Sequence, residues 1–294
     1  MEDAYAWPGD RRTTVCLTFD CDAESPFLWN EPMEARRFIG ELEQRRFGPR
    51  VGLPRILALL EELGVPGTFF VPGWTAEHHP GVLEGIVEAG HEVAAHGYVH
   101  ERINQVSPGE EDAILERSIA VFERLIGQRP AGYRSPSFQL NQGTPALLVE
   151  KGLRYDSSLM GYDHPYSLEA GEALLPEIPV EWLLDDAVQY KHVRSVKESN
   201  VVAEPRKVER LWMDEFDAMH GIGGRVFVLT MHPWISGRAS RLAALRRMIQ
   251  HMLDGSDVWF ASCREVAEYH ASSTWLQHYA TAVSTPISSD DTAA

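Results

Sequence analysis

The first apolar run of the chain reads Thr-Val-Cys-Leu-Thr-Phe at residues 14–19, and Asp20-Cys21-Asp22 follows it directly. Its length and its β-branched and aromatic residues are typical of a buried strand. Residues i and i+2 of a strand point to the same side, so the two aspartates can share one site while the strand geometry holds. In a parallel α/β fold, ligands bind at the ends of strands. A turn with one capping aspartate is the alternative interpretation.

Strand patterns and helix patterns alternate along the rest of the chain. Leucine and isoleucine recur at helical spacing over residues 53–63, and the strand pattern Thr-Phe-Phe-Val follows at 68–71. Ser107-Pro108 with Glu110 is typical of a helix start. This alternation predicts an α/β fold with a parallel sheet, either open or closed into a barrel. Further strand patterns lie at 92–94, 226–229 and 258–261.

The composition excludes several classes of protein. The 294 residues are 44% hydrophobic and include 43 acidic and 27 basic residues, a formal net charge of −16. These values exclude collagen, coiled-coil and wholly disordered chains. We find no basic patch for nucleic acid or anionic lipid, no apolar window long enough for a membrane span, no secretory signal and too few cysteines for a disulfide framework. We therefore expect a cytoplasmic protein with no nucleic-acid or membrane partner, with a single domain over 1–283 and a flexible tail at 284–294.

Two histidines follow the strand pattern at 92–94. His96 and His100 stand at i and i+4, which places them on one face of a helical turn and lets two imidazoles bind one metal ion. Two surface histidines are the alternative, because this spacing is common by chance. Together with the acidic pair at the first strand, the spacing predicts a site of two histidines and one carboxylate that leaves a position for water.

Two more polar signals follow strand patterns. His232 comes after the apolar run at 226–229 and is either a core residue or an acid/base group at the mouth of the fold. Arg134 lies in Tyr-Arg-Ser-Pro-Ser-Phe at 133–138, beside a turn fixed by proline. Each signal is weak by itself. Four polar signals that all follow strands indicate a shared site.

Taken in order, Thr-Phe-Asp-x-Asp, His-x-x-x-His, Arg-x-Pro and Leu-x-x-His resemble the motifs of the polysaccharide deacetylase family (carbohydrate esterase family four). The resemblance covers roughly Val15 to Tyr269. It implies a distorted seven-stranded (β/α) barrel that holds one divalent metal ion. Residue by residue, it implies metal ligands Asp22, His96 and His100, a catalytic base Asp20 oriented by Arg134, an acyl pocket lined by Leu229, and a general acid His232.

The sequence departs from the commonest family pattern around Cys21, which separates two aspartates that are usually adjacent. Ala-Glu-Ser then stands where Gly-Pro is usual. This form, like Pro-Val-Glu-Trp-Leu-Leu-Asp-Asp at 179–186, resembles a cytoplasmic branch with a bacterial peptidoglycan deacetylase-like protein and cyclic imide hydrolases, and with allantoinase-like members nearby. The departure leaves the implied metal chemistry unchanged and puts a polymer substrate in doubt.

The implied chemistry follows from the charges of these groups. A bound zinc-like ion makes water a nucleophile at neutral pH, Asp20 accepts its proton, and His232 protonates the departing nitrogen. Zinc is the ion expected, and cobalt or nickel would fit the same ligands. The same residues serve a linear N-acetyl amide or a cyclic imide equally well. An inactive barrel that binds a sugar or a partner protein is the non-enzymatic alternative.

Residues 23–52 hold no strand pattern, yet they are rich in aromatic residues. A segment that starts at the mouth of a barrel can fold over it as a lid. We therefore expect an enclosed pocket for a small amide or cyclic imide, with an N-acetylated sugar as the alternative substrate and with a homo-oligomer partner completing the wall. Trp29, Trp182 and Glu24 are the candidate pocket residues, although large aromatic residues are more often core.

Overall fold

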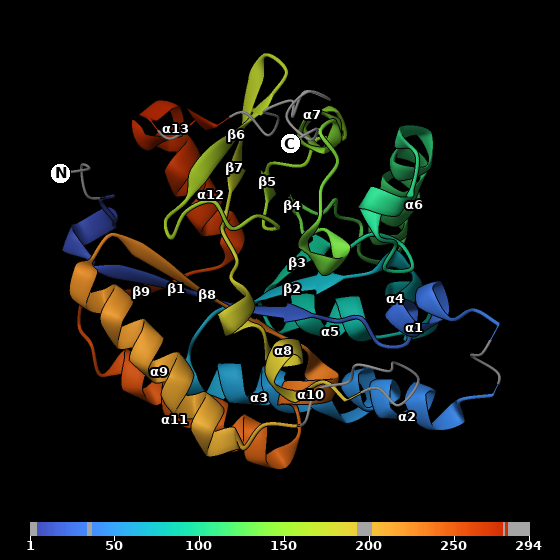
Figure 1. Ribbon diagram of the computed structural model, residues 1–294, viewed down its shortest axis with the longest axis horizontal. Coiled ribbons are helices and arrows are strands. Elements are labelled where there is room, and N and C mark those ends of the chain that lie inside the picture. Colours follow the sequence, from blue (N-terminus) through green and yellow to red (C-terminus); the bar gives the residue numbers. More distant parts are fainter. Residues whose placement is uncertain (1–4, 34–36, 193–201, 279, 282–294) are drawn as a thin grey trace, which may run out of the picture.

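The computed structural model in Figure 1 describes residues 5–33, 37–192, 202–278 and 280–281. A sheet of mainly parallel strands lies at its centre, with helices packed around it. The strands are β1 (Thr13–Asp20), β2 (Thr68–Val71), β3 (Glu92–Ala95), β4 (Gly132–Tyr133), β5 (Tyr155–Asp156), β6 (Tyr166–Ala170), β7 (Ala173–Glu177), β8 (Arg225–Met231), β9 (Val258–Phe260) and β10 (Ala280–Thr281).

The helices include two in the segment 23–52, where the sequence has no strand pattern. A π-helical turn over Gly48–Gly52 joins the second of them to α3. The helices are α1 (Ser25–Asn30), α2 (Ile39–Phe47), α3 (Leu53–Leu63), α4 (Gly73–His78), α5 (Val82–Glu88), α6 (Pro108–Ile126), α7 (Thr144–Glu150), α8 (Asp186–Tyr190), α9 (Pro205–Ile222), α10 (Pro233–Ser236), α11 (Ala239–Leu253), α12 (Cys263–Ser272) and α13 (Trp275–His278).

Seven of the strands follow one another around a ring. β1 pairs in parallel with both β8 and β2, and the ring continues through β3, β4 and β5 to β7. A single parallel bridge between Asp185 and Thr230 joins the segment after β7 to β8. This bridge closes the ring where regular strand pairing is missing, which is why the barrel is distorted. The predicted seven-stranded (β/α) barrel is thereby confirmed.

Helix α6 begins and helix α3 ends at the residues that the sequence pattern predicts. Ser107 Oγ accepts a hydrogen bond from the Glu110 backbone N–H, and the Glu110 carboxylate accepts one from the Ser107 N–H, so α6 begins with a capping box. Helix α3 ends at Gly64, whose φ of 65° is a left-handed conformation that glycine adopts without strain. Within the described residues, no helix is both long and apolar enough to cross a membrane. The predicted tail at 284–294 lies outside the described residues.

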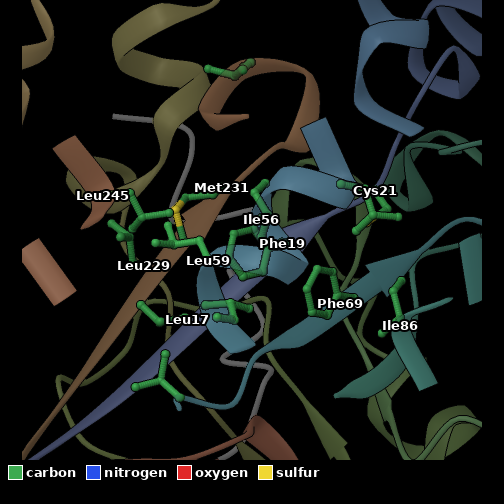
Figure 2. Close-up of a cluster of buried hydrophobic side chains, with 14 of the residues drawn as sticks. Leu17, Phe19, Cys21, Ile56, Leu59, Phe69, Ile86, Leu229, Met231 and Leu245 are labelled. Carbon is green, nitrogen blue, oxygen red and sulfur yellow. The ribbon is translucent and has the colours of Figure 1, made fainter. Parts of the chain in front are cut away.

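The side chains of β1 alternate between two buried layers. Leu17 and Phe19 lie in the cluster between the sheet and α3, where the rings of Phe19 and Phe69 stack with centroids 4.8 Å apart (Figure 2). Cys16 belongs to a second cluster on the opposite face of the strands, the face that the ring encloses. Asp20 stands four residues after Cys16, and side chains two or four residues apart on a strand point to the same side. The Asp20 side chain therefore points into the barrel.

Candidate active site

Polar side chains meet at the carboxyl ends of the parallel strands. Asp20 is the last residue of β1, with Asp22 two residues later. His96 directly follows β3, Arg134 directly follows β4, and His232 directly follows β8. Since neighbouring parallel strands end at the same rim of a barrel, residues more than 200 positions apart in the sequence come into contact.

The loop after β3 brings His96 and His100 together by a different geometry from the one predicted. The i, i+4 spacing predicts a helical turn, but residues 97–100 form a loop in which Gly97 and His100 have φ values of 66° and 62°. The Glu101 carboxylate accepts hydrogen bonds from the backbone N–H groups of residues 98 and 99, at 2.8 and 2.9 Å. The predicted helical turn is therefore wrong, and Glu101 is a positioning residue that the sequence analysis missed.

Asp22, His96 and His100 form a compact cluster, in which one ligand atom of each residue lies within 4.8 Å of the others. The Nε2 atoms of His96 and His100 lie 3.4 and 3.7 Å from the Asp22 carboxylate oxygens. His96 Nδ1 donates to the Arg134 carbonyl at 2.7 Å, so its Nε2 is left with a lone pair that faces Asp22. Asp22 Oδ1 is buried and has no hydrogen-bond partner among the described residues. This donor set suits a divalent metal ion.

The charges in the cluster favour an ionised Asp22 carboxylate, and they act in opposite directions on the two imidazoles. Burial would raise the pKa of Asp22, but His100, His96 and His232 together hold it well below its usual range. Burial lowers the pKa of His100 to about 3, against the opposing effect of Asp22. Burial also acts to lower the pKa of His96, but the carboxylates of Asp20 and Asp22 outweigh burial and raise that pKa. An ionised carboxylate and a neutral imidazole are the forms in which these side chains bind a metal ion.

Arg134 holds Asp20 beside the cluster. The guanidinium is fully buried, and its Nη1 donates to Asp20 Oδ1 at 2.8 Å and to Thr18 Oγ1 at 2.9 Å. Its other nitrogens donate to the backbone oxygen and the hydroxyl of Ser157, and the Phe70 ring lies 4.0 Å below the guanidinium carbon. Asp20 Oδ2 is thus left facing His96, 3.8 Å from its Nε2.

His232 lies on another side of the cluster and is held by Asp186. His232 Nδ1 lies 2.7 Å from Asp186 Oδ1, and the His232 backbone N–H donates to Oδ2 at 2.9 Å. Its Nε2 faces Asp22 at 3.6 Å. Burial alone would lower the pKa of His232, but the Asp186 carboxylate raises it to about 10. The sequence analysis gave Asp186 no role, although the Asp-Asp pair at 185–186 was a signal that could have revealed it.

Glu24 is almost fully buried and is bound on both sides. Its carboxylate accepts from Arg46 Nε at 2.5 Å and lies 2.6 Å from His79 Nε2. Arg46 belongs to α2, and His79 directly follows α4. Glu24 therefore ties the segment 23–52 to the rim beside Asp22, while its predicted contact with substrate stays a prediction.

The other predicted pocket residues lie in different surroundings. Trp182 is 45% exposed, and its ring centroid lies 4.8 Å from that of Phe138. Trp29 is half-buried on α1. Leu229 is fully buried in the apolar cluster of Figure 2, near Leu245. Contact of these three side chains with substrate stays a prediction.

The fold and these contacts define a class of protein: a (β/α)-barrel hydrolase with a candidate metal site between an Asp–Arg pair and a His–Asp pair. The chain belongs to the polysaccharide deacetylase family. The family profile matches residues 47–155. A peptidoglycan deacetylase of Helicobacter pylori is 30% identical over 279 residues, which are 86% of this chain and 95% of that protein.

Solved structures agree in fold. A Mycobacterium smegmatis protein assigned to the same family is 45% identical, with a TM-score of 0.87 over 90% of this chain and 92% of that one. An allantoinase has a TM-score of 0.80 over 92% of this chain and 95% of its own, at 23% identity. At that identity, the likeness to the allantoinase concerns the fold alone.

Proposed function

We propose that the protein is a metal-dependent hydrolase of non-peptide C–N bonds that acts as an N-deacetylase. The observation that carries this proposal is the convergence of the Asp22 carboxylate and the Nε2 atoms of His96 and His100 between Asp20 and His232. The H. pylori relative, named as a peptidoglycan deacetylase, supports the same type of reaction.

Asp22, His96 and His100 would hold the metal ion. Two imidazole nitrogens and one carboxylate are a common ligand set of hydrolytic metal sites. The buried Asp22 Oδ1, which has no hydrogen-bond partner in the described part of the chain, fits this use. When bound, such an ion polarises the amide carbonyl and makes water a better nucleophile. Zinc suits these ligands best, with cobalt or nickel as alternatives.

Asp20 and His232 would divide the proton transfers. Asp20 Oδ2 accepts a proton from the attacking water as the new C–O bond forms, while Arg134 keeps the carboxylate in position. His232 then gives the proton on Nε2 to the amide nitrogen as the C–N bond breaks, since its Nδ1 is engaged by Asp186. The products are a carboxylate, acetate in a deacetylation, and an amine.

Ring opening of a small cyclic imide is the second candidate, and the anchoring of the segment 23–52 favours it. A Cβ built on Gly52 would lie 2.0 Å from the Pro233 carbonyl oxygen, so the turn after α2 packs tightly against the residue after His232. The Glu24 carboxylate lies 2.6 Å from His79 Nε2, outside the segment, so the segment is held at two points. Such a segment limits the room for a long polymer beside the metal site.

A substrate panel with one metal-replete preparation tests the proposal. Acetate release from N-acetylglucosamine oligomers is measured beside ring opening of succinimide, hydantoin and allantoin, and metal content is measured in the same protein. Metal-dependent hydrolysis of any of these amides is the expected result, and the pattern of substrates separates the two candidates. If the metal-loaded protein cleaves none of them, the proposed function is wrong. Cytoplasmic location and homo-oligomeric assembly stay predictions.

A further inference from the structure

Arg45 is a buried cation that makes no ion pair within the described residues. It lies on α2, it is 4% exposed, and its guanidinium carbon is 5.2 Å from the ring centroid of Trp234, two residues after His232. Its Nε is buried and has no hydrogen-bond partner among the described residues. The acids whose charge acts on it are, strongest first, Asp22, Glu41 and Glu24. The contact with Trp234 on α10 places Arg45 beside the rim of the barrel that carries His232.

Lys191 is a second cation beside the same site. It is half-buried directly after α8, the helix that begins with Asp186. Within the described residues it makes no ion pair, although Asp22 and Asp185 are near enough for their charges to act on it. Burial lowers the pKa of Lys191, and so does the positive charge of Arg45. Gln44, the residue before Arg45, donates from its Nε2 to the carbonyl of His192, the residue after Lys191, at 3.1 Å, so the two cations lie on segments that are in contact.

Several acids around the site are paired with other residues. Asp20 is paired with Arg134, and Asp186 with His232. Glu24 is paired with both Arg46 and His79. Asp22 belongs to the candidate metal cluster, and Asp185 caps α8. Glu41 lies one helical turn before Arg45, but neither Arg45 nor Lys191 makes an ion pair with any acid within the described residues. Burying two cations without anionic partners is unfavourable, and an anion bound between them relieves that cost.

We propose that Arg45 and Lys191 form a subsite for a carboxylate of the substrate, next to the position of the amide that is cleaved. A planar guanidinium matches a carboxylate with two parallel hydrogen bonds, and an ammonium adds a compact charge. The inference rests on the proposed function and narrows it: the preferred substrate is a small amide or N-acyl compound that carries a negative charge.

Matched pairs of ligands that differ only in charge test this subsite. The probes are N-acetylmuramic acid against its methyl ester, and hydantoin-5-acetic acid against its methyl ester. Their dissociation constants are measured by calorimetry on zinc-loaded Asp20→Asn protein, in which turnover is suppressed. The acid of at least one pair is expected to bind about tenfold or more tightly than its ester. Arg45→Met or Lys191→Met should each reduce this ratio several-fold, and the double variant should bring it close to one.

Controls separate the subsite from general damage. Arg50→Met removes an exposed arginine whose partner is Glu43, and it should leave the ratio unchanged. Arg45→Lys should recover part of the preference, and Lys191→Met gives an independent reading if Arg45→Met fails to fold. A ratio near one for both pairs in the Asp20→Asn protein, or a ratio unaffected in the folded double variant, would overturn the subsite. Neither result depends on turnover, so a failure of the proposed hydrolysis is recognised separately in the wild-type substrate panel.

Discussion

Asp20 and His232 flank the same cluster, yet the protein holds them in opposite ways. Asp20 accepts from Arg134, which is buried inside the barrel and donates to Thr18 and Ser157 as well. His232 instead pairs with Asp186 at the start of the short helix α8, beside the single Asp185–Thr230 bridge that closes the ring. The proposed base is held by residues of regularly paired strands. The proposed acid is held next to the position where a single bridge replaces regular strand pairing. The two sides should therefore respond differently to substitution.

The largest effect is expected when the candidate metal site, which lies between Asp20 and His232, is removed. The double substitution His96→Ala, His100→Ala takes away two of the three ligands and should abolish metal binding and amide hydrolysis together. Metal analysis of the purified variant and its turnover are the measurements. His78→Ala, an exposed histidine on α4, is the control and should behave like the wild type. Full metal occupancy in the double variant would exclude the assigned ligands.

On the base side, Asp20→Asn should keep the metal and the fold but lower kcat by about 10²–10⁴, the usual contribution of a general base. The amide of asparagine preserves the shape beside Arg134 but accepts a proton poorly. Metal content, thermal unfolding and kcat on the best amide substrate are measured together. Normal turnover by a metal-replete Asp20→Asn protein contradicts the role given to Asp20.

On the acid side, His232→Ala should lower kcat on an amide by about 10², at the lower end of the range for acid–base catalysis. The loss should shrink for an aryl acetate, because a phenolate leaves without being protonated. The ratio of the two losses, measured on one preparation, isolates the acid role. Equal losses on the amide and the aryl ester indicate that His232 acts in some other way.

The smallest effect is expected at the partner of the acid. Asp186→Asn leaves His232 in place but removes the carboxylate that orients it and favours its charged form, so kcat on an amide should fall by about 10–100-fold, as for other groups that orient a functional side chain. Asp185→Asn is the matched control and should cost less, because Asp185 caps α8 and lies 3.8 Å from His232 Nδ1, farther than Asp186 at 2.7 Å. A larger loss at Asp185 than at Asp186 reverses the assignment of the two aspartates.

Much of the fold and of the candidate site could be predicted because the relevant signals are local. The apolar runs at 14–19, 68–71 and 226–229 are strands, and the polar residues that follow them meet at one rim. Any parallel barrel brings the carboxyl ends of its strands to one rim. The proximity of Asp20 and His232 could therefore be predicted without knowing how side chains pack.

Long-range hydrogen bonds and loop conformation were decided only by the tertiary structure. Asp186 reaches His232 across 46 residues, and Glu24 joins Arg46 to His79, contacts that depend on how helices pack and that leave no periodic pattern in the sequence. The conformation of the His100 loop likewise depends on the Glu101 carboxylate turning back to the backbone before it. The positions of the strands and the chemical types at their ends follow from local sequence, because both depend on neighbours along the chain. The hydrogen-bond partners of those groups depend on tertiary packing, because the partners are neighbours in space and not along the chain.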